Sequence, residues 1–130
     1  MADRGTPVPD ADTLHRVITP AAAAAWFPNG LLSSAAFSFP VFSVDIARLS
    51  TPEQTLARWP VGSGIVGFNC GQARQLGFDA RHEPEHGNGA HANVYNDFPT
   101  NERKRRARQL AAACAVVVAP VPPRGDAPPG

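Results

Sequence analysis

Three of the four histidines lie together in residues 82–96, HEPEHGNGAHANVYN, beside two glutamates and three asparagines. Imidazole is the usual general acid or base near neutral pH and a common metal ligand. His82, His86 and His91 are spaced by four and five residues, and a helical zinc motif also places two histidines four apart. Pro84 opposes a helix here. No fourth ligand has a recognisable spacing, so we do not predict a metal site.

The same stretch also fits a polar hairpin. Its HGNG segment supplies residues that tolerate the positive φ of a tight turn. In a strand after that turn, His91, Asn93 and Tyr95 share one face, while Ala92 and Val94 share the other. A hairpin alone accounts for the glycines and for the alternation of polar and apolar residues. If the polar face lines a cleft, His91 and Asn93 become candidate catalytic residues.

An arginine in an apolar strand gives a second candidate. The segment TLHRVI contains Arg16, and a guanidinium is costly to bury without a partner. The guanidinium must pair with a carboxylate, bind a ligand anion, or emerge at an exposed edge of the sheet. Its planar fork suits an anion such as phosphate. Ser34, before AAF, leaves room for a ligand. We predict a pocket in which Arg16 and Ser34 bind a nucleotide-like molecule beside His91 and Asn93; the alternative is a salt-bridged Arg16 and ordinary edge-strand serines.

Short elements must position these residues. The 130 residues include 14 prolines and 11 glycines, and 43% are hydrophobic, which is typical of one folded domain with many turns. Strands are predicted at 13–18, 31–39, 41–49, GIVGFN, FDARHE and AHANVYN. Helices are predicted after Thr19 and Pro20, over 50–59 with a capping box from Ser50 to Glu53, in GQARQLG, and from Thr100 or Asn101.

This alternation of short strands and helices predicts an α+β fold, with a small mixed or antiparallel sheet of about four to six strands and three to four short helices. We expect a single globular domain over residues 13–119. The segments 1–12 and 120–130 are polar or rich in proline and glycine, and are predicted to be flexible tails.

Charge and cysteine content narrow the function classes. The net charge of +1 argues against general binding of polyanions. Cys70 and Cys114 are too few for a disulfide framework and are interpreted as buried, reduced thiols, with a Cys70–His91 pair as the alternative.

The apolar run 110–119 is shorter than the roughly 20 residues of a membrane span. The N-terminus lacks the apolar stretch of a secretory signal. We therefore predict a cytoplasmic protein without a membrane partner.

One segment concentrates positive charge. Successive residues of a helix turn by about 100°, so its cations surround the helix and must be solvated or bind something anionic. No aromatic residue lies between them, which argues against nucleic acid. An acidic protein partner is the alternative, as for an operon-partner or a toxin/antitoxin-type accessory protein. The cations are Arg103, Lys104, Arg105, Arg106 and Arg108.

Residues 14–94 resemble a set of small bacterial proteins of unknown activity that share a leading L-x-R, an SSAAF segment and a terminal AHA segment. The first part is also similar to the RES-domain branch of the ADP-ribosyltransferase-like fold, in the order of Arg16, Gly30, Ser34 and a helix from Ser50. That resemblance implies NAD handling, with Arg16 as a phosphate contact and Ser34 as a pocket wall. No glutamate follows the helix, since Glu53 lies at its start, so whether the protein is an enzyme stays open.

Overall fold

The computed structural model describes residues 4–121, which form an α+β fold built on one antiparallel sheet. The seven strands lie in the order β1-β5-β6-β3-β2-β4-β7. They are β1 (Thr6–Pro7), β2 (Thr13–Ile18), β3 (Val41–Ile46), β4 (Gly64–Asn69), β5 (Asp79–His82), β6 (His91–Tyr95) and β7 (Ala115–Val118). The helices are α1 (Pro20–Trp26), α2 (Pro52–Leu56), α3 (Cys70–Gln75) and α4 (Thr100–Ala113), with 3-10 turns η1 (Pro28–Gly30) and η2 (Ser34–Ala36). The predicted fold class is confirmed, and the sheet is larger than predicted.

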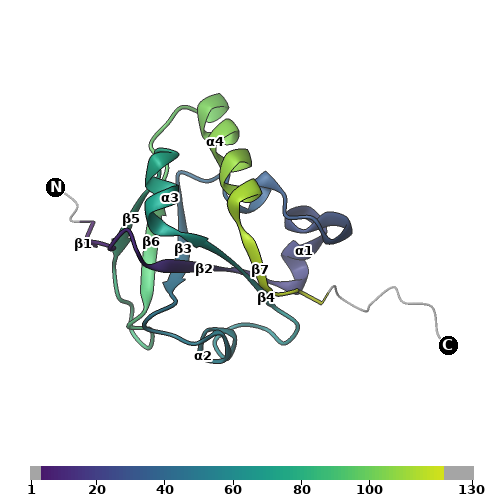
Figure 1. The fold of residues 1–130 in the computed structure, drawn as a ribbon. Helices are drawn as coiled ribbons and strands as arrows, with labels where there is room; N and C mark the ends of the chain where they lie inside the picture. Colours follow the sequence, from purple (N-terminus) through teal and green to yellow (C-terminus); the bar gives the residue numbers. More distant parts are fainter. Residues whose placement is uncertain (1–3, 122–130) are drawn as a thin grey trace.

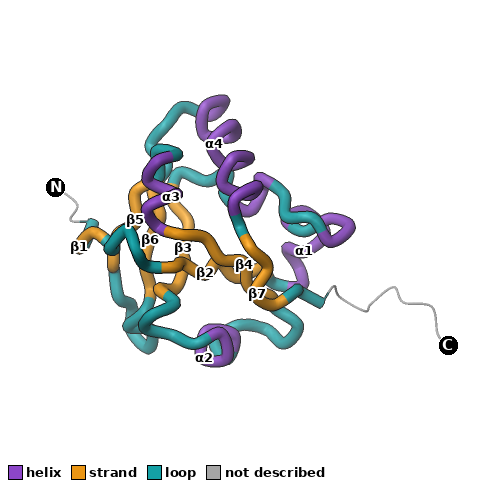
Figure 2. Tube along the Cα trace, in the orientation of Figure 1, coloured by secondary structure: helices purple, strands orange, loops and turns teal. Residues whose placement is uncertain are grey.

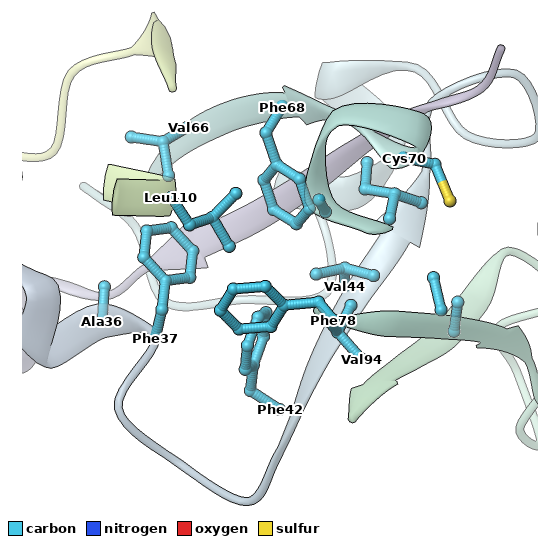
Figure 3. Packing of buried hydrophobic residues seen from close by; sticks show 14 of the residues in the cluster. Ala36, Phe37, Phe42, Val44, Val66, Phe68, Cys70, Phe78, Val94 and Leu110 are labelled. Carbon is cyan, nitrogen blue, oxygen red and sulfur yellow. The ribbon is translucent and has the colours of Figure 1, made fainter. Parts of the chain in front are cut away.

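The helices cover the two faces of the sheet unequally. Helices α1, α3 and α4 lie on one face, and the short α2 lies on the other (Figures 1 and 2). The first face carries the hydrophobic core, in which Phe37 packs against Phe42 and Phe68 with ring centroids 5.4 and 5.8 Å apart (Figure 3). Leu110 of α4 is fully buried against this cluster. The second face is therefore free to carry polar side chains.

Helix α2 starts one residue later than the predicted capping box. Thr51, not Ser50, is the N-cap: its hydroxyl accepts from the Gln54 amide at 3.1 Å, and the Gln54 side chain accepts from the Thr51 amide at 3.0 Å. Glutamine serves in a capping box as glutamate does. The Ser50 hydroxyl is instead directed inward, 2.8 Å from that of Thr55. The shift matters for the site because it places Ser50 in a buried polar network.

The strand predicted over 31–39 is wrong. Ser33 accepts a hydrogen bond from the Ala35 amide with its own hydroxyl and caps the 3-10 turn η2. Such local bonding by serine competes with strand pairing. The turn then directs Ala36 and Phe37 into the core, where both are fully buried.

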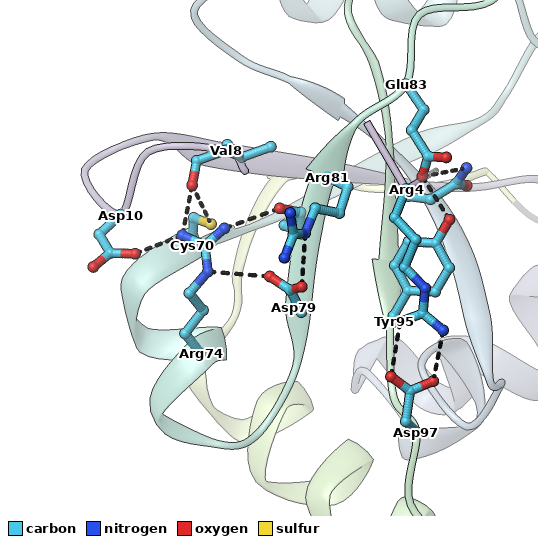
Figure 4. Close-up of polar contacts among 12 residues, drawn as sticks. Arg4, Val8, Asp10, Cys70, Arg74, Asp79, Arg81, Glu83, Tyr95 and Asp97 are labelled. Atoms are coloured by element: carbon cyan, nitrogen blue, oxygen red, sulfur yellow. Dashed lines mark hydrogen bonds and ion pairs between the residues drawn. The ribbon is translucent and has the colours of Figure 1, made fainter. Parts of the chain in front are cut away.

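Both ends of the described chain join the sheet. Strand β1 falls within the tail predicted for 1–12, and Val8 beside it is only 1% exposed. Arg74 holds this segment by donating to the Val8 carbonyl and to Asp10 (Figure 4). Strand β7 pairs with β4 at the opposite edge. The parts of the predicted tails at 1–3 and 122–130 lie outside the described residues. Within residues 4–121, the longest helix has 14 residues and none could cross a bilayer.

Candidate functional site

A row of polar side chains crosses the sheet face that the core does not use. In the sheet, His15 of β2 lies opposite Asp45 of β3, and Asp45 lies opposite His91 of β6. Cross-strand partners project from the same face. Ser43, two residues before Asp45, joins them there. Strand alternation thus places two imidazoles, a carboxylate and a hydroxyl side by side.

This row forms the floor of a pocket of about 270 Å³. Residues after α2 form one wall, and the loop between β5 and β6 forms another. The polar residues of the lining are His15, Arg16, Ser43, Asp45, Arg58, Glu85, His86, Asn88 and His91, with Trp59 beside Arg58. The predicted HGNG turn therefore becomes a pocket wall.

Asp45 organises the buried end of the pocket. The residue is 6% exposed, and its carboxylate accepts hydrogen bonds from Thr55 at 2.7 Å, Arg58 at 2.5 Å and Asn88 at 2.8 Å. Burial alone raises the pKa of this carboxyl, but the three donors outweigh it, so the net pKa is lowered. Asp45 is thus an ionised anchor that fixes α2 and the β5–β6 loop against the sheet.

His91 is held in one tautomer. It is 5% exposed, and its Nδ1 lies 2.8 Å from the backbone carbonyl oxygen of Glu83. A carbonyl oxygen can only accept, so the neutral ring carries its proton on Nδ1. The bare Nε2 then accepts from the Ser43 hydroxyl, whose oxygen lies at 3.1 Å. Glu85 Oε1 lies 3.5 Å from the same Nε2.

Glu83 is itself anchored through its side chain. Its carboxylate accepts from the Tyr95 hydroxyl at 2.6 Å (Figure 4) and from the Asn93 amide at 3.2 Å. The carbonyl that orients His91 belongs to this residue. Asn93 therefore lies on the same face as His91, as predicted from the alternation, but it contacts Glu83 and is not part of the pocket lining.

His15 has a buried polar atom without a partner. The side chain is 6% exposed, and among the described residues its Nδ1 has no hydrogen-bond partner. Burial lowers the pKa of His15, and the nearby Asp45 offsets this only in part. The ring is therefore neutral at pH 7. An unpaired buried nitrogen costs about 1–3 kcal/mol.

Arg16 and His91 project from opposite faces of the sheet, yet both reach Ser43. Arg16 donates to the carbonyl oxygens of Ala36 and Ser43, each at 3.1 Å, and its guanidinium lies over the rings of Trp26 and Phe42. Strands β2 and β3 pair only at Leu14–Ile46 and His15–Asp45. The guanidinium thus satisfies a carbonyl where these strands separate. Within residues 4–121 the Arg16 guanidinium donates to carbonyl oxygens and to no carboxylate, so the alternative of a salt-bridged Arg16 is wrong.

The structure does not bring Ser34 to the pocket. Ser34 opens η2, and its carbonyl accepts from the Ser38 hydroxyl on the core side of the molecule. Within the described residues, no group of three or more histidine, cysteine, aspartate or glutamate side chains could hold a metal ion. His82 instead contacts the Gly89 carbonyl at 2.8 Å.

The thiols and most of the basic segment have internal partners. Cys70 is buried near the Val8 carbonyl, and burial raises the pKa of Cys114 to about 12, so neither thiol is poised as a nucleophile. Arg105 and Arg106 pair with Glu102. Arg103 donates to the Phe98 carbonyl. The remaining cations, Lys104 and Arg108, are exposed.

Fold and site together define a small α+β domain with a polar pocket on the α2 face of its sheet. Comparison with protein-family models, with curated proteins and with solved structures found no significant match to the chain. The functional argument therefore depends on the geometry of the pocket.

Sequence reasoning missed five residues of the pocket: His15, Ser43, Asp45, Arg58 and Trp59. The signal for two of them was present, because VFSVDI alternates apolar and polar residues and so places Ser43 and Asp45 on one face. In TLHRVI, the same alternation places His15 on the face of the strand opposite to Leu14. Arg58 could not be identified in this way, since its reach to Asp45 depends on where α2 packs.

Proposed function

We propose that the protein is a small-molecule-handling domain whose pocket binds a phosphate-bearing, nucleotide-like ligand, with NAD as the first candidate. The observation that carries the proposal is the buried, unpartnered Nδ1 of His15 in the pocket wall. Because this nitrogen is closed off from solvent in the unliganded chain, a ligand bonds to it when the imidazole turns toward the pocket.

Two neighbouring side chains support this choice of ligand class. Within the described residues, both hydrogen bonds of the Arg58 side chain use Nη2, so Nε and Nη1 remain for an anion. Trp59 is 43% exposed at the same pocket and offers an indole face on which a planar ring can stack. The volume of about 270 Å³ suits one ring-and-phosphate portion of a dinucleotide, with the rest outside.

Replacing His15 with leucine tests the proposal. Leucine removes a nitrogen that has no partner in the described chain, so we expect the unliganded stability to be unchanged or slightly higher. For the native chain, saturating NAD or ADP at about 100 times the dissociation constant should add about 2.7 kcal/mol, or several degrees in Tm. His15→Leu should lose most of that shift in a thermal-denaturation assay.

His82→Leu is the matched control, because His82 lies outside the pocket lining and should leave the ligand response intact. If neither NAD nor ADP shifts the native Tm, or if His15→Leu responds as the native chain does, the proposal is wrong.

A second candidate function is docking of an acidic protein partner through α4. Lys104 and Arg108 are exposed, lie one helical turn apart, and have no partner in the described chain. If this is their role, Lys104→Glu with Arg108→Glu should abolish salt-sensitive binding of a polyglutamate peptide, measured by fluorescence anisotropy. Gln109→Glu, on the same helix, is the control and should reduce binding only slightly. Absence of binding to the native chain would refute this candidate.

A further inference from the structure

We infer that Ser43 is a nucleophile and His91 its general base, so that the pocket cleaves carboxylic esters. This inference rests on the same pocket as the proposed function and adds a reaction to it. Nucleophilic catalysis by serine requires an adjacent base within hydrogen-bond reach and a third group that orients the base. Each of these three parts has a definite counterpart here.

The nucleophile and the base meet by strand register. Ser43 pairs with Asn93, and His91 lies two residues earlier on β6, so His91 is the diagonal neighbour of Ser43 on one sheet face. The Ser43 hydroxyl oxygen is 3.1 Å from His91 Nε2, and Ser43 is exposed while His91 is buried. A substrate can therefore reach the hydroxyl while the base stays shielded from bulk water.

The third part is the Glu83 carbonyl. Its bond to Nδ1 at 2.8 Å fixes the tautomer that leaves Nε2 free to take the serine proton. Tyr95 (Figure 4) and Asn93 hold the Glu83 carboxylate, which makes both of them positioning residues. When His91 gains a proton, Glu85 Oε1 at 3.5 Å is near enough to stabilise the imidazolium.

The reaction balances without a cofactor. Ser43 Oγ attacks the ester carbonyl carbon while its proton moves to His91 Nε2. The C–O bond to the alcohol then breaks, and His91 returns the proton to the leaving oxygen, which leaves an acyl-serine. Water attacks the acyl carbon, His91 takes its proton and passes it to Ser43, and a carboxylic acid is released. Arg58 lines the same pocket as Ser43, and its Nε and Nη1, free of partners in the described chain, are the cationic donors available to the oxyanion.

An active-site-directed fluorophosphonate tests the pair directly. Such a probe forms an Oγ–P bond and releases fluoride, and peptide mass spectrometry locates the adduct. We expect one adduct, on Ser43, that is lost in Ser43→Ala. In His91→Gln labelling should slow at least about 100-fold, the low end for loss of a general base. Ser38→Ala, which removes a serine outside the pocket lining, should label as the native chain does.

Ser43→Cys provides a second readout if His91→Gln disturbs the fold. Burial raises the pKa of Cys70 and of Cys114. A thiol beside His91 should therefore react with iodoacetamide at least about tenfold faster than either of them. Hydrolysis of p-nitrophenyl acetate by the native chain, absent in Ser43→Ala, would add turnover to labelling.

The outcomes separate this inference from the proposed function. A Tm shift with NAD or ADP but no adduct on Ser43 would overturn the nucleophile and leave the binding pocket in place. An adduct on Ser43 without any nucleotide-induced shift would support the inference and overturn the ligand class. Labelling of Ser43 at the native rate in a folded His91→Gln variant would show that His91 is not the base.

Discussion

Asp45→Ala is expected to lower the free energy of unfolding by about 3 kcal/mol, the lower end of the range for breaking a buried ion pair from one side. The substitution removes the acceptor for Thr55, Arg58 and Asn88 together. The Arg58 cation, whose side chain is 31% exposed in the native chain, would lose its only carboxylate partner among the described residues. Urea unfolding followed by tryptophan fluorescence measures the loss, because Trp59 adjoins the network.

Asp45→Asn is the matched control and gives the loss a pH signature. In the folded chain the pKa of Asp45 lies below its ordinary value of 3.8. A lowered carboxyl pKa adds stability above the unfolded pKa, and this stability disappears as pH falls through the folded pKa. The difference between native and Asp45→Asn stability should therefore shrink from neutral pH toward about pH 3. A difference that is constant over that range would show that the charge of Asp45 does not stabilise the fold.

Much of the fold was predictable because local patterns and tertiary structure agree. The β2 segment TLHRVI and the β4 segment GIVGFN are apolar enough to be central strands, and both are. Thr19 followed by Pro20 gave the start of α1, where the Thr19 hydroxyl accepts from the Ala22 amide as expected of an N-cap. The segment 31–39 was predicted as a strand because its apolar residues fit one. Its Ser33 hydroxyl instead accepts a hydrogen bond from the Ala35 amide and caps a turn.

The site was only partly predictable for a different reason. The alternation of polar and apolar residues identified the face that carries His91 and Asn93, because this pattern depends on one strand alone. The pairing of β3 with both β2 and β6 depends on the order of strands in the sheet, which no local pattern encodes. That order brings His15 and Ser43 to His91, whereas alternation within β2 directs the Arg16 side chain to the face opposite His15. Sequence therefore indicated the strands that carry His91 and Arg16, but not the neighbouring residues His15, Ser43 and Asp45 that complete the lining.

Arg16→Ala is expected to destabilise the protein by about 3–4 kcal/mol even without a ligand. The change leaves the carbonyls of Ala36 and Ser43 without this donor, at about 1–3 kcal/mol for each that stays buried and unpaired. It also removes a cation over Trp26 and Phe42, a contact that contributes up to about 2 kcal/mol when desolvated. Burial lowers the pKa of Arg16 to about 10, so the guanidinium still carries its charge at neutral pH.

Arg16→Lys distinguishes a framework role from the predicted phosphate contact. Lysine keeps the charge but lacks the planar fork that bridges two carbonyls while stacking on a ring. If Arg16 supports the sheet where β2 and β3 separate, Arg16→Lys should recover less than half of the lost stability in urea unfolding. Its Tm should still rise with NAD or ADP by nearly the native amount, because the guanidinium and the His91 imidazole project from opposite faces. An Arg16→Lys protein with native stability and no nucleotide response would instead assign Arg16 to the ligand.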